Sequence, residues 1–171
     1  MKKCLILFLV CFAAFSSKAQ SVKTVITNGD TTFLIRAKHY QGVIFPASYT
    51  TNINQKARFT PGKEDINAAE DELSKIWNKV NLRGKGADTR NILDNVTPYF
   101  SNYKRQYYGY INDQEQKVVH IHLLNFFDKP MAAQYFTGWG SRYMVGQDSF
   151  YERNTAGFSY NLVTRVVVSE N

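Results

Sequence analysis

The sequence predicts a single α+β domain in which one long helix packs on a curved antiparallel sheet of about four or five strands. Two observations lead to this fold class. Apolar residues recur at helical spacing over residues 61–82, and two strand-like segments flank a short polar turn between residues 103 and 127. Because a helix with one apolar stripe must bury it, we expect the apolar face of those strands to be its partner.

The helix is expected over residues 61–82. Thr60 can cap it, and Pro61 suits its first turn, where a missing N–H costs nothing. Acidic residues dominate its first half and basic residues its end, a gradient that stabilises the helix dipole. We expect Trp77 to be buried against the strands. The apolar stripe consists of Ile66, Ala69, Leu73, Ile76, Trp77 and Val80.

The central strand pair is expected at YKRQYYGYI (103–111) and KVVHIHLLNFF (117–127), joined by the turn NDQEQ. Their β-branched and aromatic residues favour strands. The turn leaves the register open. An odd-length loop places Tyr107 opposite Ile121, whereas an even-length loop places Tyr108 there and brings Gly109 beside the histidines.

The remaining elements have weaker signals. An N-terminal hairpin is expected because Asn28-Gly29-Asp30, a turn sequence that tolerates positive φ, separates two β-rich segments. Residues 20–58 form this hairpin and an irregular lead-in, and residues 59–171 form the helix and an antiparallel meander. Further predictions are a short helix at 89–96, short strands at 42–45 and 142–145, and a closing strand pair at 150–160 and 165–169.

One long helix followed by an antiparallel meander is the layout of cystatin-like folds, an analogy based on the order of the elements. The segments FTPGKEDI (59–66) and YKRQYYGYI (103–111) also resemble a group of small uncharacterised secreted bacterial proteins, with an FTPxxEDI helix start and a YxRQYxGYI strand. The resemblance covers about residues 59–169. It implies no catalytic or binding residue, because the shared motifs carry no known chemistry.

The N-terminus predicts export. Lys2 and Lys3 precede an apolar run of 12 residues, and Ser17-Lys18-Ala19 offers a signal-peptidase site, so residues 1–19 are the expected signal peptide. That run is shorter than the roughly 20 residues that span a bilayer. Lipidation at Cys11 is the alternative to cleavage after Ala19. The mature domain, residues 20–171, is then periplasmic or extracellular and has no membrane span.

Removal of residues 1–19 also removes both cysteines and three lysines, so the formal net charge falls from +7 to +4. The mature chain therefore has no disulfide and no thiolate metal site. Its lysines and arginines are scattered among acids, whereas a nucleic-acid site would gather them on one face. We expect no nucleic-acid partner and no cofactor.

Two groups of residues are candidates for binding. His120 and His122 alternate on a strand, so they share a face and can approach one metal ion, with His39 as a third ligand. Because Zn²⁺ normally takes at least three protein ligands and no Asp or Glu lies nearby at ligand spacing, no metal site is predicted. The alternative is that both histidines lie on a solvated strand face.

Tyrosines are the second candidate group. Tyr107, Tyr108 and Tyr110 lie within one strand and can form a platform on which a sugar or peptide stacks. The alternative is that strand alternation divides them between the core and the surface. With His120 and His122 they are the predicted binding residues. No catalytic residue is predicted.

The sequence therefore predicts a secreted or periplasmic binding module without catalytic activity, either an inhibitor of a peptidase or a binder of an envelope component. Its partner is an unidentified protein or envelope component, and its oligomeric state is open. The alternative is a small metal-dependent envelope hydrolase that uses His120 and His122.

Overall fold

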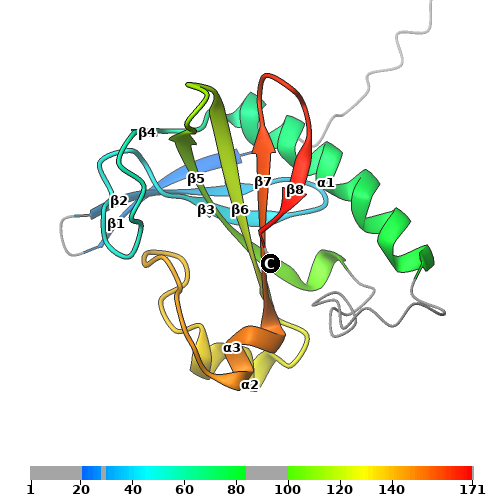
Figure 1. The fold of residues 1–171 in the computed structure, drawn as a ribbon. Helices are drawn as coiled ribbons and strands as arrows, with labels where there is room; N and C mark the ends of the chain where they lie inside the picture. Colours follow the sequence, from blue (N-terminus) through cyan, green and yellow to red (C-terminus); the bar gives the residue numbers. More distant parts are fainter. Residues whose placement is uncertain (1–20, 28–29, 84–99, 171) are drawn as a thin grey trace, which may run out of the picture.

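The computed structural model of the chain describes residues 21–27, 30–83 and 100–170 (Figure 1). The predicted signal peptide and the predicted helix at 89–96 lie outside these residues. Among the described helices, none is both long and apolar enough to cross a membrane.

Within the described residues, eight strands form one mixed sheet in the order β1-β2-β3-β5-β6-β7-β8, and β4 pairs with β5 beside β3. Every pairing is antiparallel except that of β3 with β5, which is parallel. The strands are β1 (Ser21–Thr27), β2 (Asp30–Arg36), β3 (Gln41–Ile44), β4 (Arg58–Phe59), β5 (Tyr103–Ile111), β6 (Lys117–Asn125), β7 (Thr155–Asn161) and β8 (Val167–Ser169).

The predicted fold class was wrong, because the sheet is mixed and has eight strands where four or five antiparallel strands were expected. The cystatin-like layout therefore does not describe this chain. Alternation of apolar and polar residues predicts strands but not their partners. Here β3 pairs with both β2 and β5, so the N-terminal hairpin continues the main sheet.

Helix α1 (Lys63–Arg83) begins two residues later than expected. Asp65 accepts a hydrogen bond from the Gly62 N–H at 2.9 Å and so satisfies a backbone donor at the helix start. Thr60 does not cap the helix; its Oγ1 accepts from the Ala47 N–H at 3.0 Å. The first turn is therefore tied to its own Asp65.

The register of β5 against β6 is that of an odd-length loop. Ile111 pairs with Lys117, which leaves the five residues 112–116 as the loop, and Tyr107 lies opposite Ile121. Asn112 fixes this loop, because its Oδ1 accepts from the N–H groups of Gln114 at 3.1 Å and Gln116 at 2.8 Å.

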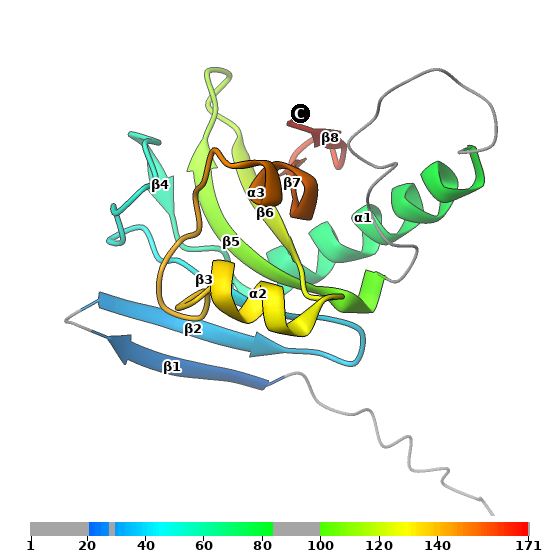
Figure 2. The same ribbon diagram turned by 90° about the horizontal axis from the view of Figure 1, so that it is seen from below.

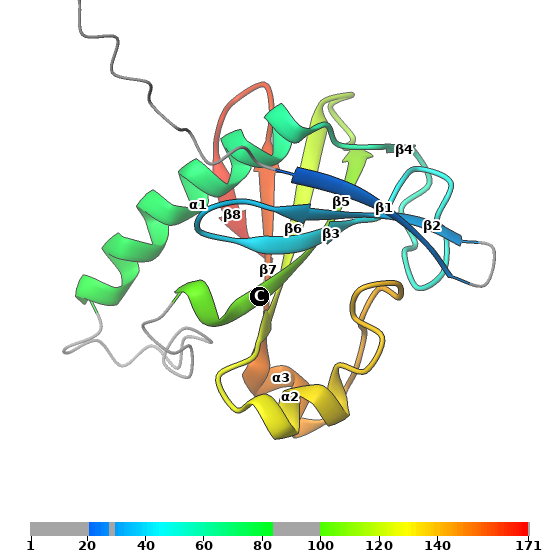
Figure 3. The same cartoon turned by 180° about the vertical axis from the view of Figure 1, so that it is seen from behind.

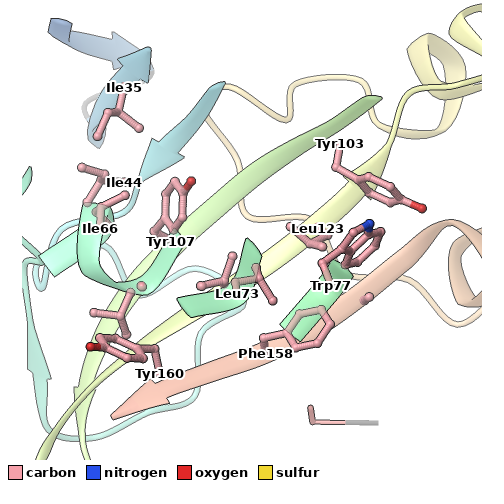
Figure 4. Close-up of a cluster of buried hydrophobic side chains, with 14 residues drawn as sticks. Ile35, Ile44, Ile66, Leu73, Trp77, Tyr103, Tyr107, Leu123, Phe158 and Tyr160 are labelled. Atoms are coloured by element: carbon pink, nitrogen blue, oxygen red, sulfur yellow. The ribbon is translucent and has the colours of Figure 1, made fainter. Parts of the chain in front are cut away.

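The main core lies between α1 and the sheet (Figure 4). The α1 stripe of Ile66, Ala69, Leu73 and Trp77 packs against inward residues of β5, β6 and β7. Trp77 is 4% exposed, and its ring lies 5.4 Å from that of Tyr103, which confirms its predicted burial against the hairpin.

Three buried polar side chains, Glu70, Tyr107 and Arg105, interact with one another within this core. Glu70 Oε1 on α1 accepts from the Tyr107 hydroxyl at 2.8 Å and lies 3.4 Å from Arg105 Nε. Burial raises the pKa of Glu70, and Arg105 opposes that shift. Tyr107 is therefore part of the α1 side of the sheet.

Helices α2 (Lys129–Tyr135) and α3 (Ser149–Asn154) lie on the other side of the sheet from α1 (Figure 2 and Figure 3). A single 3₁₀ turn, η2 (Phe100–Asn102), leads into β5. The strand expected at 142–145 is irregular, and 150–154, expected as strand, is helical. Asp148 caps α3 by accepting from the Tyr151 N–H at 2.7 Å, a local bond that strand propensity does not anticipate.

Candidate functional site

His120 and His122 share the face of β6 that points away from α1. Their neighbours Val119, Ile121 and Leu123 lie in the α1 core, which confirms the predicted division of faces. The expected solvation of the histidine face was wrong, because His120 is 5% and His122 6% exposed.

Six side chains form what we call the histidine–tyrosine cluster. β6 contributes both histidines and β5 contributes a tyrosine. Residues 139–144, which we call the covering segment, α3 and the residue after β8 contribute the rest. Within the described residues, both histidines contact phenols, and His120 also contacts a carboxylate. The members are Tyr108, His120, His122, Tyr143, Tyr151 and Glu170.

His120 is contacted on both ring nitrogens. Nε2 lies 3.0 Å from the Tyr143 hydroxyl, and Nδ1 lies 2.8 Å from Glu170 Oε2. The Glu170 contact is an ion-pair approach and not an aligned hydrogen bond. The imidazole also stacks on the Tyr108 ring, with centroids 4.5 Å apart. Carboxylate, imidazole and phenol thus form a series from the half-exposed Glu170 inward.

The hydrogen bonds of His122 determine its tautomer. The Tyr151 hydroxyl lies 2.7 Å from the Met144 carbonyl oxygen, to which it can only donate. Since a hydroxyl has one proton, Tyr151 accepts from His122 Nε2–H across the 3.1 Å that separates them. His122 Nδ1 is then unprotonated, and it has no hydrogen-bond partner among the described residues.

His122 and the three tyrosines of the cluster are uncharged near pH 7. Burial, followed by the charge of His120, lowers the pKa of His122 to about 3, so that ring is neutral near pH 7. Burial also raises the pKa values of Tyr108, Tyr143 and Tyr151, which keeps all three phenols protonated. These phenols can donate hydrogen bonds, but they are not activated as nucleophiles.

A segment held by Gln106 covers the cluster. The Gln106 side-chain amide donates to the carbonyls of Trp139 at 2.7 Å and Arg142 at 2.8 Å, and its Oε1 accepts from the Met144 N–H at 2.8 Å. The Tyr143 N–H donates to the Tyr49 hydroxyl at 3.1 Å. Three bonds from one side chain therefore fix the covering segment over the histidines.

The predicted binding residues are divided between the two faces of the sheet. Tyr108, His120 and His122 come together, and Tyr110 lies beside them, with its hydroxyl 3.2 Å from Ser159 Oγ. Tyr107 lies in the α1 core, and Gly109 packs under Phe59 instead of beside the histidines. His39 is exposed in the connection between β2 and β3.

Sequence reasoning missed Gln106, Tyr143, Tyr151 and Glu170. Only Gln106 carried a signal, since it is a polar residue within a strand of apolar and aromatic residues. Tyr143 and Tyr151 lie in segments that were expected as strands but form an irregular stretch and the helix α3. Their position over the histidines follows from tertiary contacts.

The described part of the chain contains no group of three His, Cys, Asp or Glu side chains placed to hold one metal ion. Both histidine Nε2 atoms are already bonded to tyrosines. The cluster ties α3 and the chain after β8 to the sheet through the contacts of Tyr151 with His122 and of Glu170 with His120.

No family model, curated protein or solved structure shows significant similarity to this chain. The fold and the cluster define a domain built on one mixed, mainly antiparallel sheet, with a covered histidine–tyrosine face on the side away from α1.

Proposed function

We propose that the chain is an exported binding module, secreted or periplasmic and without catalytic activity, that binds an envelope component or a peptidase. Support comes from the N-terminal Lys2-Lys3 and the apolar run that follows them. Further support comes from the enclosure of the histidine–tyrosine cluster, in which each histidine Nε2 is hydrogen-bonded to a tyrosine hydroxyl. A binding surface is then expected outside the cluster.

Exposed apolar residues on α2 and just before it support this proposal. We call Phe127, Met131 and Tyr135 the α2 strip; they are 61%, 38% and 44% exposed. Met131 and Tyr135 lie four residues apart on α2 and so share a helix face. The Tyr135 ring stacks on Phe150 of α3, with centroids 4.1 Å apart. Exposed aromatic and methionine side chains are enriched where proteins bind partners.

Binding to purified cell-wall sacculi and to envelope membrane vesicles tests the proposal. The double variant M131S/Y135S removes two residues of the α2 strip, and we expect it to cosediment less than the unchanged protein. V163S is the matched control, because Val163 is 65% exposed and lies in the connection between β7 and β8, away from α2 (Figure 1). A parallel assay measures inhibition of a panel of peptidases. Absence of both binding and inhibition would refute the proposal.

One observation favours the alternative of a metal-dependent hydrolase, namely the approach of Glu170 to His120 at 2.8 Å. Two histidines and a carboxylate are a common ligand set of catalytic zinc, although these three side chains are not placed to hold one ion in the described part of the chain. Metal analysis of protein purified without chelator tests it, with H122Q as the comparison. Stoichiometric metal that is lost in H122Q would support the hydrolase, and metal-free protein would exclude it.

A further inference from the structure

Acidic residues are distributed unevenly along the chain. Of the 14 acidic residues, five lie within Glu64–Glu72 on α1. There is no Asp or Glu between Thr31 and Gly62, nor between Lys129 and Gln147. These acid-free segments supply most of β2, all of β3 and α2, and the segment that covers the histidine–tyrosine cluster. The acids on the side of the sheet away from α1 lie instead at the cap of α2, on α3 and its cap, and after β8.

Three cations, Arg36, Lys104 and Lys129, lie near one another at one end of the side away from α1. Arg36 on β2 lies opposite Gln41 on β3, which in turn lies opposite Lys104 on β5, so the three residues form a row across the sheet. Lys104 Nζ donates to Gln41 Oε1 at 2.7 Å and lies 5.8 Å from the centre of the Trp139 ring. Burial and then the charges of Arg36, Arg105 and Lys129 lower the pKa of Lys104.

The three cations have no carboxylate partner within the described residues, because none of the ion pairs there involves Arg36, Lys104 or Lys129. The acid nearest to Lys129 in the sequence is Asp128, whose side chain caps α2 by accepting from the Met131 N–H at 3.1 Å. An anion from outside the chain would compensate this concentration of positive charge.

The cations adjoin the α2 strip. Lys129 is the first residue of α2 and lies between Phe127 and Met131 in the chain. Apart from Ala132, every residue of α2 is exposed, so the helix presents apolar and basic side chains to the same solvent. An acidic peptide would use the cations and leave the exposed apolar residues without a role. An amphiphile with an anionic headgroup uses both.

We propose that the α2 strip, with Arg36, Lys104 and Lys129 beside it, docks on the surface of a membrane that contains anionic phospholipid. The apolar side chains enter the boundary between headgroups and acyl chains, and the cations contact lipid phosphates. This inference rests on the proposed function and names the envelope component that the module binds.

Vesicle cosedimentation tests the inference. The mature protein is mixed with phosphatidylcholine vesicles that contain or lack phosphatidylglycerol, at low and high salt. We expect binding to the anionic vesicles only, weakened by salt. The double variant R36Q/K129Q should lower the partition coefficient roughly 25-fold, since each surface cation contributes about fivefold. M131S/Y135S should lower it at both salt concentrations.

The matched control is K63Q/K75Q, which removes the same charge from exposed positions on α1, on the opposite side of the sheet. It should bind anionic vesicles within about twofold of the unchanged protein once general attraction is screened by salt. Equal loss in both double variants would overturn the proposal, because it would make binding a matter of net charge. So would salt-sensitive binding to polyglutamate without binding to vesicles, which would point to an acidic protein.

Sacculus binding distinguishes the membrane inference from the proposed binding function. A protein that binds sacculi but not anionic vesicles overturns the membrane inference and leaves the proposed binding function intact. A protein that binds neither and inhibits no peptidase overturns both.

Discussion

At the scale of single residues, the buried ring of His122 couples folding to pH. Its pKa is lowered from 6.5 to about 3 in the folded protein, chiefly by burial. Between these two values the unfolded chain binds a proton that the folded protein does not, so stability rises with pH and is lost as the pH falls. His122 therefore destabilises the folded protein in mildly acidic solution.

Urea denaturation at pH 7 and pH 5 checks this prediction. The free energy of unfolding should fall by about 2 kcal/mol more in the unchanged protein than in H122Q over that interval. H39Q is the control, because it makes the same substitution at an exposed histidine outside the cluster. Equal pH dependence in H122Q and the unchanged protein would mean that folding does not lower the pKa of His122.

Gly109 tests how tightly β4 packs on β5. A Cβ at this position would lie 2.7 Å from both the ring and the carbonyl oxygen of Phe59, which is too close. G109A should therefore reduce the free energy of unfolding by about 1–3 kcal/mol, as overpacking does. G157A is the matched control, since its nearest neighbours would lie at 3.5 Å, an ordinary contact. Thermal and urea denaturation measure both, and equal stability would show that β4 moves aside.

The sequence predicted part of the candidate site. Strand alternation alone placed His120 and His122 on one face, because the period of two is a property of the strand itself. Their burial depends on Tyr143 and Tyr151, which come from segments wrongly expected as strands and contact the histidines through tertiary hydrogen bonds and ring packing. Local pattern carries no information on such partners.

At the scale of secondary-structure elements, Gln106 holds the covering segment on the sheet through three hydrogen bonds. Q106A would leave the Trp139 and Arg142 carbonyls and the Met144 N–H without these partners. Each buried unsatisfied group costs on the order of 1–3 kcal/mol, so the segment should open locally. Amide hydrogen exchange at Met144 should accelerate by about tenfold or more, as a loss of that size implies.

Exchange at Val119 and Ile121 provides the control, because both amides belong to the interior of the sheet. These amides should exchange at nearly unchanged rates in Q106A. A uniform acceleration across β6 would mean that Gln106 supports the whole fold and not the covering segment alone.

Elements with their own strong local pattern were the ones that could be predicted. The helix near 61–82 and the strands around the NDQEQ turn follow from periodicity and composition. The sheet as a whole did not follow, because the pairing of β3 with β5 joins distant segments. Residues 150–154 form a helix through the Asp148 cap, although their aromatic residues favour a strand.

At the scale of the whole molecule, export remains a prediction with a direct measurement. Cleavage after Ala19 should leave a protein of 152 residues that begins at Gln20 and contains no cysteine. Intact-mass spectrometry of the exported protein checks it. A retained Cys4 would contradict cleavage, and a lipid adduct on Cys11 would show the alternative processing.

The parallel contact between β3 and β5 has a consequence for folding kinetics. Ile44 lies opposite Tyr107, 63 positions further along the chain, whereas a loop of five residues closes β5 on β6. Long loops cost entropy before their contacts return energy, so β3 should join a sheet that has already formed. V43A, at a fully buried position of β3, should accelerate unfolding and leave the folding rate nearly unchanged in stopped-flow measurements. A V43A protein that folds more slowly would place β3 in the nucleus instead. Changes in β3 are thus expected to shorten the lifetime of the folded protein without delaying its formation.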